Sequence, residues 1–130
     1  MNMVSRFLVV LMLVMFTAPA FAGMPMQMWK CEMEDDATEE AVMAAAEKWL
    51  AGAKTVKGGD GMKAHVLFPV AVNAIGQADV WFIVTAPTFE EWGRFWDNYP
   101  DSDVAQGEDS DNSNLFACPD SALWDATAVK

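Results

Sequence analysis

The two cysteines of the chain, Cys31 and Cys118, constrain its fold more than any other feature of the sequence. They lie near opposite ends of the part that follows an apolar N-terminal segment, and no C-x-x-C spacing points to a redox-active or metal-binding thiol pair. In an oxidising compartment such a pair forms a disulfide, so we predict a Cys31–Cys118 bond. This bond would close a loop of nearly the whole domain, and the fold must therefore bring the two ends of the domain together.

Residues 1–22 have the pattern of a cleavable secretory signal peptide, which would place both cysteines in an oxidising compartment. Arg6 is the only charged residue there, an apolar run covers residues 7–16, and Ala20-Phe21-Ala22 matches the A-x-A cleavage pattern. The apolar run is shorter than the roughly 20 residues that a membrane span needs. We predict a periplasmic or secreted protein in which residues 23–130 form a single domain with no membrane attachment after cleavage.

The acidic composition disfavours two classes of partner. The chain has 8 basic and 19 acidic residues, which is a formal net charge of −11. A surface of this sign repels the phosphates of nucleic acids and the headgroups of anionic lipids. We therefore expect the protein to bind neither nucleic acid nor a membrane surface.

The first half of the domain changes its hydrophobic period from that of a strand to that of a helix. Residues 26–33 alternate like a strand, with Trp29, Cys31 and Met33 on one face. The sequence Asp36-Ala37-Thr38-Glu39 then has the form of a helix-capping box, an acidic N-cap residue with Glu three residues on. A helix is predicted to follow, and its apolar stripe consists of Val42, Ala45, Ala46, Trp49, Leu50 and Ala53.

Two strands and a second helix come next. Residues 63–72 alternate, residues 80–85 are apolar on both sides, and the connector 73–79 is short enough for a hairpin. Pro69 indicates that the first of these strands lies at a sheet edge or bends there. Thr88-Phe89-Glu90-Glu91 is a second capping box. The apolar stripe of the helix that it begins consists of Phe89, Trp92, Phe95, Trp96 and Tyr99.

The C-terminal part is predicted to be a long acidic loop and a last strand. Residues 101–114 are rich in acids, Ser and Asn and contain no basic residue, which is typical of a solvated loop. A final strand is predicted within 123–129, with 115–118 as a separate extended piece.

The resulting order of elements, βαββαβ, is the split βαβ or ferredoxin-like pattern. We predict an α+β domain with an antiparallel sheet, the strand order 4-1-3-2 and two helices on one face. This strand order places the first and last strands side by side. It therefore brings Cys31 near Cys118, in agreement with the predicted disulfide.

The second face of this sheet would also be apolar, because residues 80–85 are apolar on both sides and Met26 and Met28 lie opposite Trp29. In element order and two-sided hydrophobicity, most of residues 26–129 resembles the dimeric α+β-barrel superfamily, in which two such sheets pack face to face. The resemblance implies a homodimer. Members of that superfamily include cofactor-free monooxygenases, isomerases, haem proteins and stress-response proteins, and because one fold hosts so many activities it implies no catalytic residue.

Trp29, Trp81 and His65 are the candidate site residues. Six tryptophans are the most unusual feature of the composition, and those on helical stripes are expected to pack in the core. Trp29 and Trp81 lie on central strands, where aromatic side chains can line a pocket for a flat or apolar small molecule. His65, the only histidine, is the one candidate for proton transfer, because an imidazole titrates near neutral pH.

We expect neither a metal nor a cofactor. The acidic segment could offer oxygen ligands to calcium, but a register counted from Asp109 lacks the glycine and the final glutamate of an EF-hand. Met24, Met26 and Met28, together with Met33 and His65, could offer ligands to copper, but the alternation of the first three also describes the apolar face of a strand. The sequence contains no phosphate-binding glycine motif and no zinc-ligand spacing.

Three functions remain open at this point. The leading hypothesis is a homodimeric domain that binds a small apolar or aromatic molecule without strong catalytic machinery. The second is a cofactor-free barrel enzyme, monooxygenase- or isomerase-like, that uses His65 as a proton shuttle. The third is a structural or protein-interaction module whose second sheet face docks a different protein.

Overall fold

The structure is a computed structural model that describes residues 23–71, 79–112 and 115–129, with the side chains of 108–112 left out. The predicted signal peptide and most of the predicted hairpin connector lie outside the described residues. The elements are β1 (Met24–Met33), α2 (Glu39–Ala53), β2 (Lys63–Leu67), β3 (Val80–Thr85), α3 (Phe89–Asn98), α4 (Asp103–Asn112) and β4 (Phe116–Ala126).

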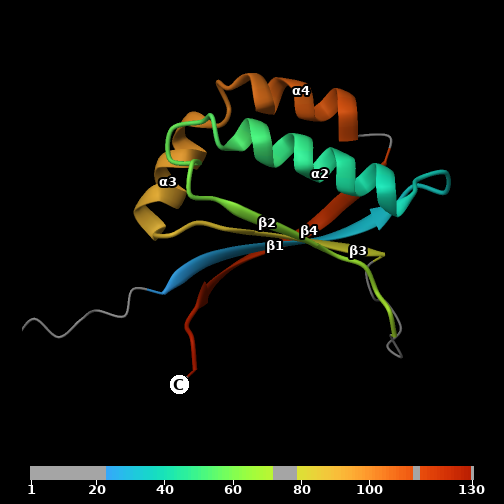
Figure 1. The fold of residues 1–130 in the computed structure, drawn as a ribbon, viewed down its shortest axis with the longest axis horizontal. Helices are drawn as coiled ribbons and strands as arrows, with labels where there is room; N and C mark the ends of the chain where they lie inside the picture. The colour runs from blue at the N-terminus through green and yellow to red at the C-terminus, as the bar shows by residue number, and fades with distance from the viewer. Residues whose placement is uncertain (1–22, 72–78, 113–114, 130) are drawn as a thin grey trace, which may run out of the picture.

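The four strands form one antiparallel sheet in the order β2-β3-β1-β4. This is the predicted strand order, and the predicted ferredoxin-like α+β class is confirmed. The helices all lie on one side of the sheet, and the other side is left without a covering layer (Figure 1). No helix in the described part of the chain has the length and apolar character needed to cross a membrane.

A disulfide joins the neighbouring strands β1 and β4. Cys31 and Cys118 are bonded to each other, their Cα atoms lie 4.0 Å apart, and Cys31 is fully buried. The predicted pairing is therefore present in the structure. It links the first strand of the domain to the last, as the position of the cysteines requires.

The last strand is longer than predicted. Instead of two separate pieces, β4 runs without a break from Phe116 to Ala126. The register with β1 shifts between Lys30 and Glu32, which leaves an extra residue on β4 beside Pro119. Proline lacks the N–H that a regular strand pairing needs, but a bulge at a sheet edge accommodates it. The proline thus marks an irregularity within the strand and does not end it.

The two predicted capping boxes have different outcomes. At α3 the Thr88 Oγ1 accepts a hydrogen bond from the Glu91 N–H at 3.1 Å, as predicted. At α2 the N-cap residue is Thr38 and not Asp36, because the Thr38 Oγ1 accepts from the Ala41 N–H at 3.2 Å. A backbone bond from the Ala37 N–H to the Glu34 carbonyl closes a turn just before it, so the helix starts after this turn.

The prediction of a loop at 101–114 is wrong, because α4 occupies most of this segment. The Ser102 Oγ donates to the Tyr99 carbonyl at 2.6 Å and accepts from the Ala105 N–H at 3.3 Å, which caps the new helix. Val104 and Ala105 pack against the core. The helix is thus supported by the Ser102 cap and by the packing of Val104 and Ala105. In the sequence these residues lie among many acidic ones, and the composition therefore favoured a loop.

The second predicted strand is shorter than expected. β2 ends at Leu67, two residues before Pro69, although the alternating pattern continues to Val72. The strand lies at the edge of the sheet, which confirms the interpretation of the proline.

The glycine-rich loop after α2 packs tightly against α3. Gly58 has a φ of 95°, a conformation that favours glycine, and a Cβ atom there would lie 2.6 Å from the Phe95 backbone nitrogen. Phe95 is fully buried at the centre of the core. The glycines therefore permit close approach of the loop to α3.

Candidate ligand-binding site

A cavity of about 290 Å³ lies between the sheet and the helices. We call it the tryptophan cavity. Its lining consists of Trp29, Ala45, Ala46, Trp49, Ala64, Phe82, Val84, Trp96, Tyr99, Phe116 and Cys118.

The cavity exists because small and large side chains face each other across the two layers. On the helix side, Ala45 and Ala46 are consecutive lining residues of α2 and fill little space. On the sheet side, Trp29 of β1 and Phe82 of β3 are paired neighbours that point toward the helices. Alanine on one layer opposite rigid rings on the other leaves room that neither layer fills.

Trp96 of α3 forms a fixed part of the wall, because aromatic rings surround it. Its ring centroid lies 5.0 Å from that of Tyr99, 5.1 Å from Phe95, 5.5 Å from Trp92 and 6.4 Å from Trp29. Offset and edge-to-face contacts of this kind hold aromatic rings in defined orientations. A molecule in the cavity would therefore meet a preformed aromatic surface.

Two tryptophans of the cavity wall have indole N–H groups in different environments. The Trp49 Nε1 donates to the Tyr99 hydroxyl at 3.0 Å, so this donor is satisfied within the protein. The Trp96 Nε1 is buried and has no hydrogen-bond partner among the described residues. A buried donor without an acceptor is unusual in folded proteins, because the group loses its hydrogen bond to water.

The lining contains no acidic residue, no Lys, Arg or His, and so no permanent charge. An ion would lose its hydration here without gaining a counter-charge, which is costly. The cavity is thus suited to an uncharged molecule. Elsewhere, the described residues hold no group of three or more His, Cys, Asp and Glu side chains that could bind a metal.

The structure does not bring the three predicted site residues together. Trp29 lines the tryptophan cavity on the helix side of the sheet. Trp81 and His65 point to the opposite side, because Trp81 neighbours Phe82 in β3 and His65 pairs with Ile83. Trp29 is thus separated by the sheet from Trp81 and His65 within one subunit, and a proton-transfer role for His65 would require a substrate on the face away from the helices.

Trp49 and Trp96 are cavity residues that the sequence interpretation assigned to core packing. Both do lie on helical apolar stripes, and both contact the core. One sequence signal could have indicated a cavity beside Trp49, namely the pair Ala45 and Ala46 on the same apolar stripe. Two alanines cannot fill the space that a neighbouring tryptophan opens between the layers.

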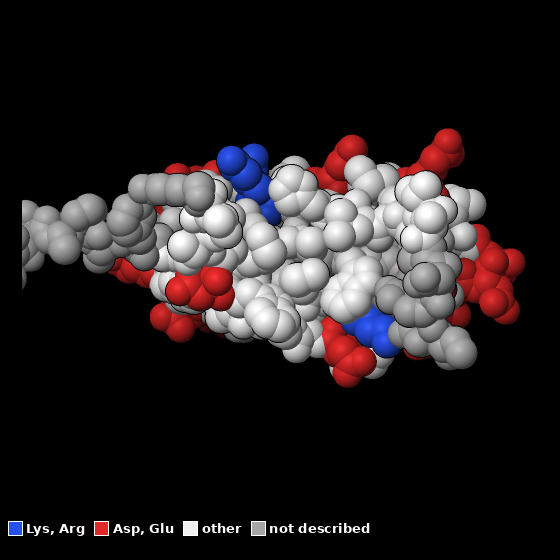
Figure 2. All heavy atoms as spheres, turned by 90° about the horizontal axis from the view of Figure 1, so that it is seen from below, with Lys and Arg blue, Asp and Glu red and all other residues white. Residues whose placement is uncertain are grey.

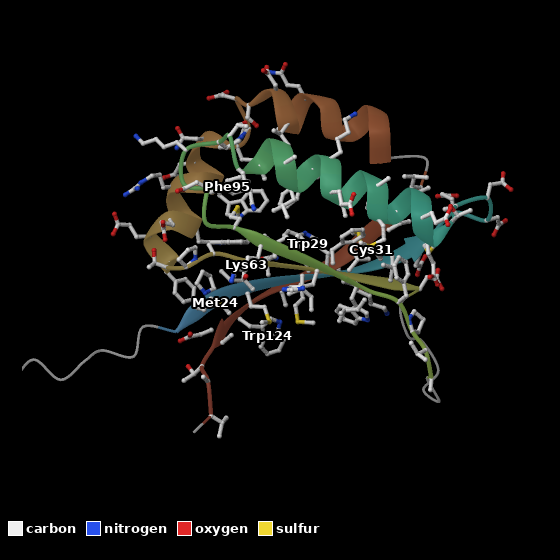
Figure 3. All side chains as sticks on the ribbon, viewed as in Figure 1. Met24, Trp29, Cys31, Lys63, Phe95 and Trp124 are labelled. Atoms are coloured by element: carbon white, nitrogen blue, oxygen red, sulfur yellow. A yellow bond between two sulfur atoms is a disulfide. The ribbon has the colours of Figure 1, made fainter. Side chains whose placement is uncertain are left out.

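The sheet face turned away from the helices is apolar and uncovered. We call it the open sheet face. Met24 and Trp124 extend from it, whereas Trp29 and Phe95 lie between the sheet and the helices (Figure 3). Trp124 is 57% exposed and Leu67 is 46% exposed. The strand register places on this face Met24, Met26, Met28, Leu67, Trp81, Ile83 and Trp124.

The comparisons with known proteins show similarity of fold only. No protein-family model matches the sequence, and no curated protein matches it either. A dimeric ferredoxin-like protein of unknown function from Bacteroides fragilis is 10% identical over 82% of this chain and 97% of its own, with a TM-score of 0.42. A dimeric ferredoxin-like protein of unknown function from Thermobifida fusca is 11% identical over 85% and 96%, with a TM-score of 0.44. A protein of unknown function from Rhodopseudomonas palustris is 13% identical over 92% of both chains, with a TM-score of 0.46.

Proposed function

We propose that the protein is an exported binding protein for a small, uncharged, apolar or aromatic molecule, which occupies the tryptophan cavity. One observation carries the proposal: a cavity of about 290 Å³ with six aromatic rings and no charged side chain in its lining. Pockets for small ligands are concave, mostly apolar and largely preformed, and this volume lies at the small end of their usual range. The ligand is accordingly small.

Export is supported by the disulfide. Disulfides form and persist in the periplasm and outside the cell, and they are rare in the cytosol. The bond between Cys31 and Cys118 is compatible with such a compartment, and the signal-like segment at 1–22 points the same way.

The direct test is titration with α-tetralone, an uncharged two-ring ketone, with binding measured by calorimetry and by tryptophan fluorescence. Trp29, Trp49 and Trp96 line the cavity, so a bound ligand changes the emission of rings that it touches. We expect saturable binding of one molecule per chain. If neither α-tetralone nor a panel of other one- and two-ring uncharged compounds binds, the proposal is overturned.

Filling the cavity from α2 should abolish this binding. In Ala46→Phe the added phenyl group takes up roughly half of the cavity, since an empty cavity of about 150 Å³ is enough for benzene. We expect the affinity for α-tetralone to fall at least about 10-fold. The matched control is Ala44→Phe, an exposed position of the same helix, where the affinity should stay within about 2-fold. An equal effect of both substitutions would place the ligand elsewhere.

We also propose that the protein is a homodimer whose subunits pack through the open sheet face. Two chains with a net charge of −11 repel each other, so they associate most readily where carboxylates are few. Figure 2 shows the open sheet face as a broad uncharged area, with acidic residues mainly at its margin. Lys30 on this face lies opposite Asp120 in the strand register, and Lys63 lies on the same face. A second copy offers the same mainly apolar surface, as a twofold interface requires.

A charge introduced within this interface should separate the subunits. We expect the wild-type protein to sediment as a dimer in analytical ultracentrifugation, and Trp124→Glu to raise the dimer Kd by about 100-fold or more, because an unpaired carboxylate would be buried. Leu123→Glu is the matched control: Leu123 is 47% exposed on the same strand but pairs with Gln27 and so faces the other side. A monomeric wild-type protein, or equal dissociation by both variants, would contradict the dimer.

A further inference from the structure

We propose that Cys118 is the residue at which an external thiol attacks the Cys31–Cys118 disulfide, that a small uncharged thiol reaches it through the tryptophan cavity, and that a molecule bound in the cavity blocks this reaction. The control by a bound molecule rests on the proposed function, whereas the route to Cys118 does not. The inference follows from the burial of the two cysteines, the position of Cys118 in the cavity wall and the strand that the disulfide holds.

The two cysteines of the disulfide differ in access. Cys31 is fully buried and belongs to a core cluster with Val42 and Val80. Cys118 is only partly buried. Thiol–disulfide exchange requires a thiolate to reach one of the two sulfur atoms, so access decides which of them is attacked. A thiol that reacts with the folded protein must therefore attack at Cys118.

The disulfide lies on the cavity side of the sheet. Cys118 is one of the residues that line the tryptophan cavity. Its partner Cys31 shares a strand face with Trp29, another lining residue, and both lie on the helix side (Figure 3). A cavity of about 290 Å³ has room for a small thiol, since about 150 Å³ is enough for benzene. The uncharged lining disfavours a thiol that carries a net charge.

The reaction is an ordinary thiol–disulfide exchange. The thiolate of the external thiol attacks the Cys118 Sγ, the Sγ–Sγ bond breaks, and Cys31 leaves as a thiolate that takes up the proton released by the attacking thiol. Cys118 then carries a mixed disulfide. A second molecule of the thiol attacks the external sulfur of this adduct. Two thiol molecules are thus oxidised to one external disulfide, and both cysteines are reduced to thiols.

Reduction would damage the cavity itself. Phe116 and Cys118 are the lining residues that β4 contributes, and β4 is an edge strand that pairs only with β1. Without the bond to Cys31, this part of the wall is held by strand pairing and packing alone. A molecule in the cavity therefore protects the bond that shapes the cavity, and loss of the bond weakens binding. Coupling between two sites is reciprocal in this way by thermodynamic necessity.

The test of the route measures the rate at which excess 2-mercaptoethanol, a small uncharged thiol, reduces the disulfide of the intact protein. Ala46→Phe places a phenyl group in the cavity that Cys118 lines, and we expect it to slow the reduction at least about 5-fold. The matched control is Ala44→Phe at an exposed position of the same helix, where the rate should stay within about 2-fold.

Transient opening of the fold is the alternative route for the thiol, and it predicts the opposite result. A side chain enlarged between packed layers usually destabilises a protein, so opening and reduction would become faster in Ala46→Phe. Urea denaturation of both variants supplies the stability with which each rate is compared. Reduction that slows without a matching gain in stability distinguishes the cavity route from opening.

Peptide mapping after an acid quench identifies the sulfur that is attacked. We expect the mercaptoethanol adduct on Cys118 to exceed that on Cys31 at least about 10-fold. The control by a bound molecule is tested with α-tetralone at about ten times its Kd. About one protein in eleven is then unoccupied, so the reduction of the wild-type protein should slow about 10-fold.

The possible failures can be told apart. If Ala46→Phe is reduced as fast as the wild-type protein, or if the adduct forms equally on Cys31, the cavity route to Cys118 is overturned, whether or not the cavity binds α-tetralone. If α-tetralone binds without slowing the reduction, the control by a bound molecule is overturned. If neither α-tetralone nor the other uncharged compounds bind, the proposed function fails and that control fails with it, while the reduction rates still decide the route.

Discussion

Removing the disulfide should lower the free energy of unfolding by about 4–5 kcal/mol. Cys31 and Cys118 are separated by 87 residues, and the chain-entropy relation gives this value for a loop of that length. A domain of this size is stabilised by only about 5–15 kcal/mol. We therefore expect Cys31→Ala/Cys118→Ala to be partly unfolded at room temperature, as measured by urea denaturation.

The loss should concentrate in one strand. β4 lies at the edge of the sheet, pairs only with β1, and has mostly exposed side chains. Without the disulfide, the amides of β4 should exchange fastest with solvent deuterium. The amides of β3, which lies between two other strands, should remain protected. Wild-type protein treated with a reducing agent should behave like the double variant. A loss of unfolding free energy below about 1 kcal/mol, or amide exchange that is equally fast in all four strands, would show that packing alone holds β4 on the sheet.

Phe95→Ala should have the second-largest effect, a loss of about 3–5 kcal/mol of unfolding free energy. Phe95 is the largest fully buried side chain among the described residues. Its ring lies 6.3 Å from Trp49, 5.1 Å from Trp96 and 5.2 Å from Tyr99, between centroids. The deletion leaves a void where the glycine-rich loop, α2 and α3 meet, and the rigid neighbouring side chains cannot collapse into it.

The same substitution should also weaken ligand binding, because Phe95 supports three cavity residues from behind. Chemical denaturation measures the loss of unfolding free energy, and calorimetry with α-tetralone measures the loss of affinity. Phe89→Ala provides the control on the same helix, since Phe89 is 43% exposed, and it should cost less than about 1 kcal/mol. Similar losses for the two variants would mean that α3 is held mainly by its surface and not by the core.

Local sequence patterns predicted most of the fold, since each of them reflects a local cause. The continuous apolar run of residues 80–85 predicted β3 with its observed bounds, and Thr88 and Glu91 predicted the start of α3. Periodicity and capping depend on residues only a few positions apart. The disulfide was also predictable, because two cysteines in an oxidising compartment have only each other as partners.

Other features depend on contacts between distant segments. The helix α4 forms because Val104 meets α2 at Gly52, a contact that no local pattern reveals. The bulge that lets β4 continue past Pro119 depends on its pairing with β1.

The candidate site was the least predictable part. The sequence by itself determined the order of the four strands and of the helices α2 and α3, the disulfide and an excess of aromatic side chains, and it named Trp29 as a candidate pocket residue. Only the tertiary structure decided that Trp29 and Trp81 lie on opposite faces and that Trp49 and Trp96 complete the cavity. The physical reason is that a side chain's face depends on strand register, and a shift of one residue would reverse it. A cavity likewise arises from the fit between layers, which exists only after they have packed.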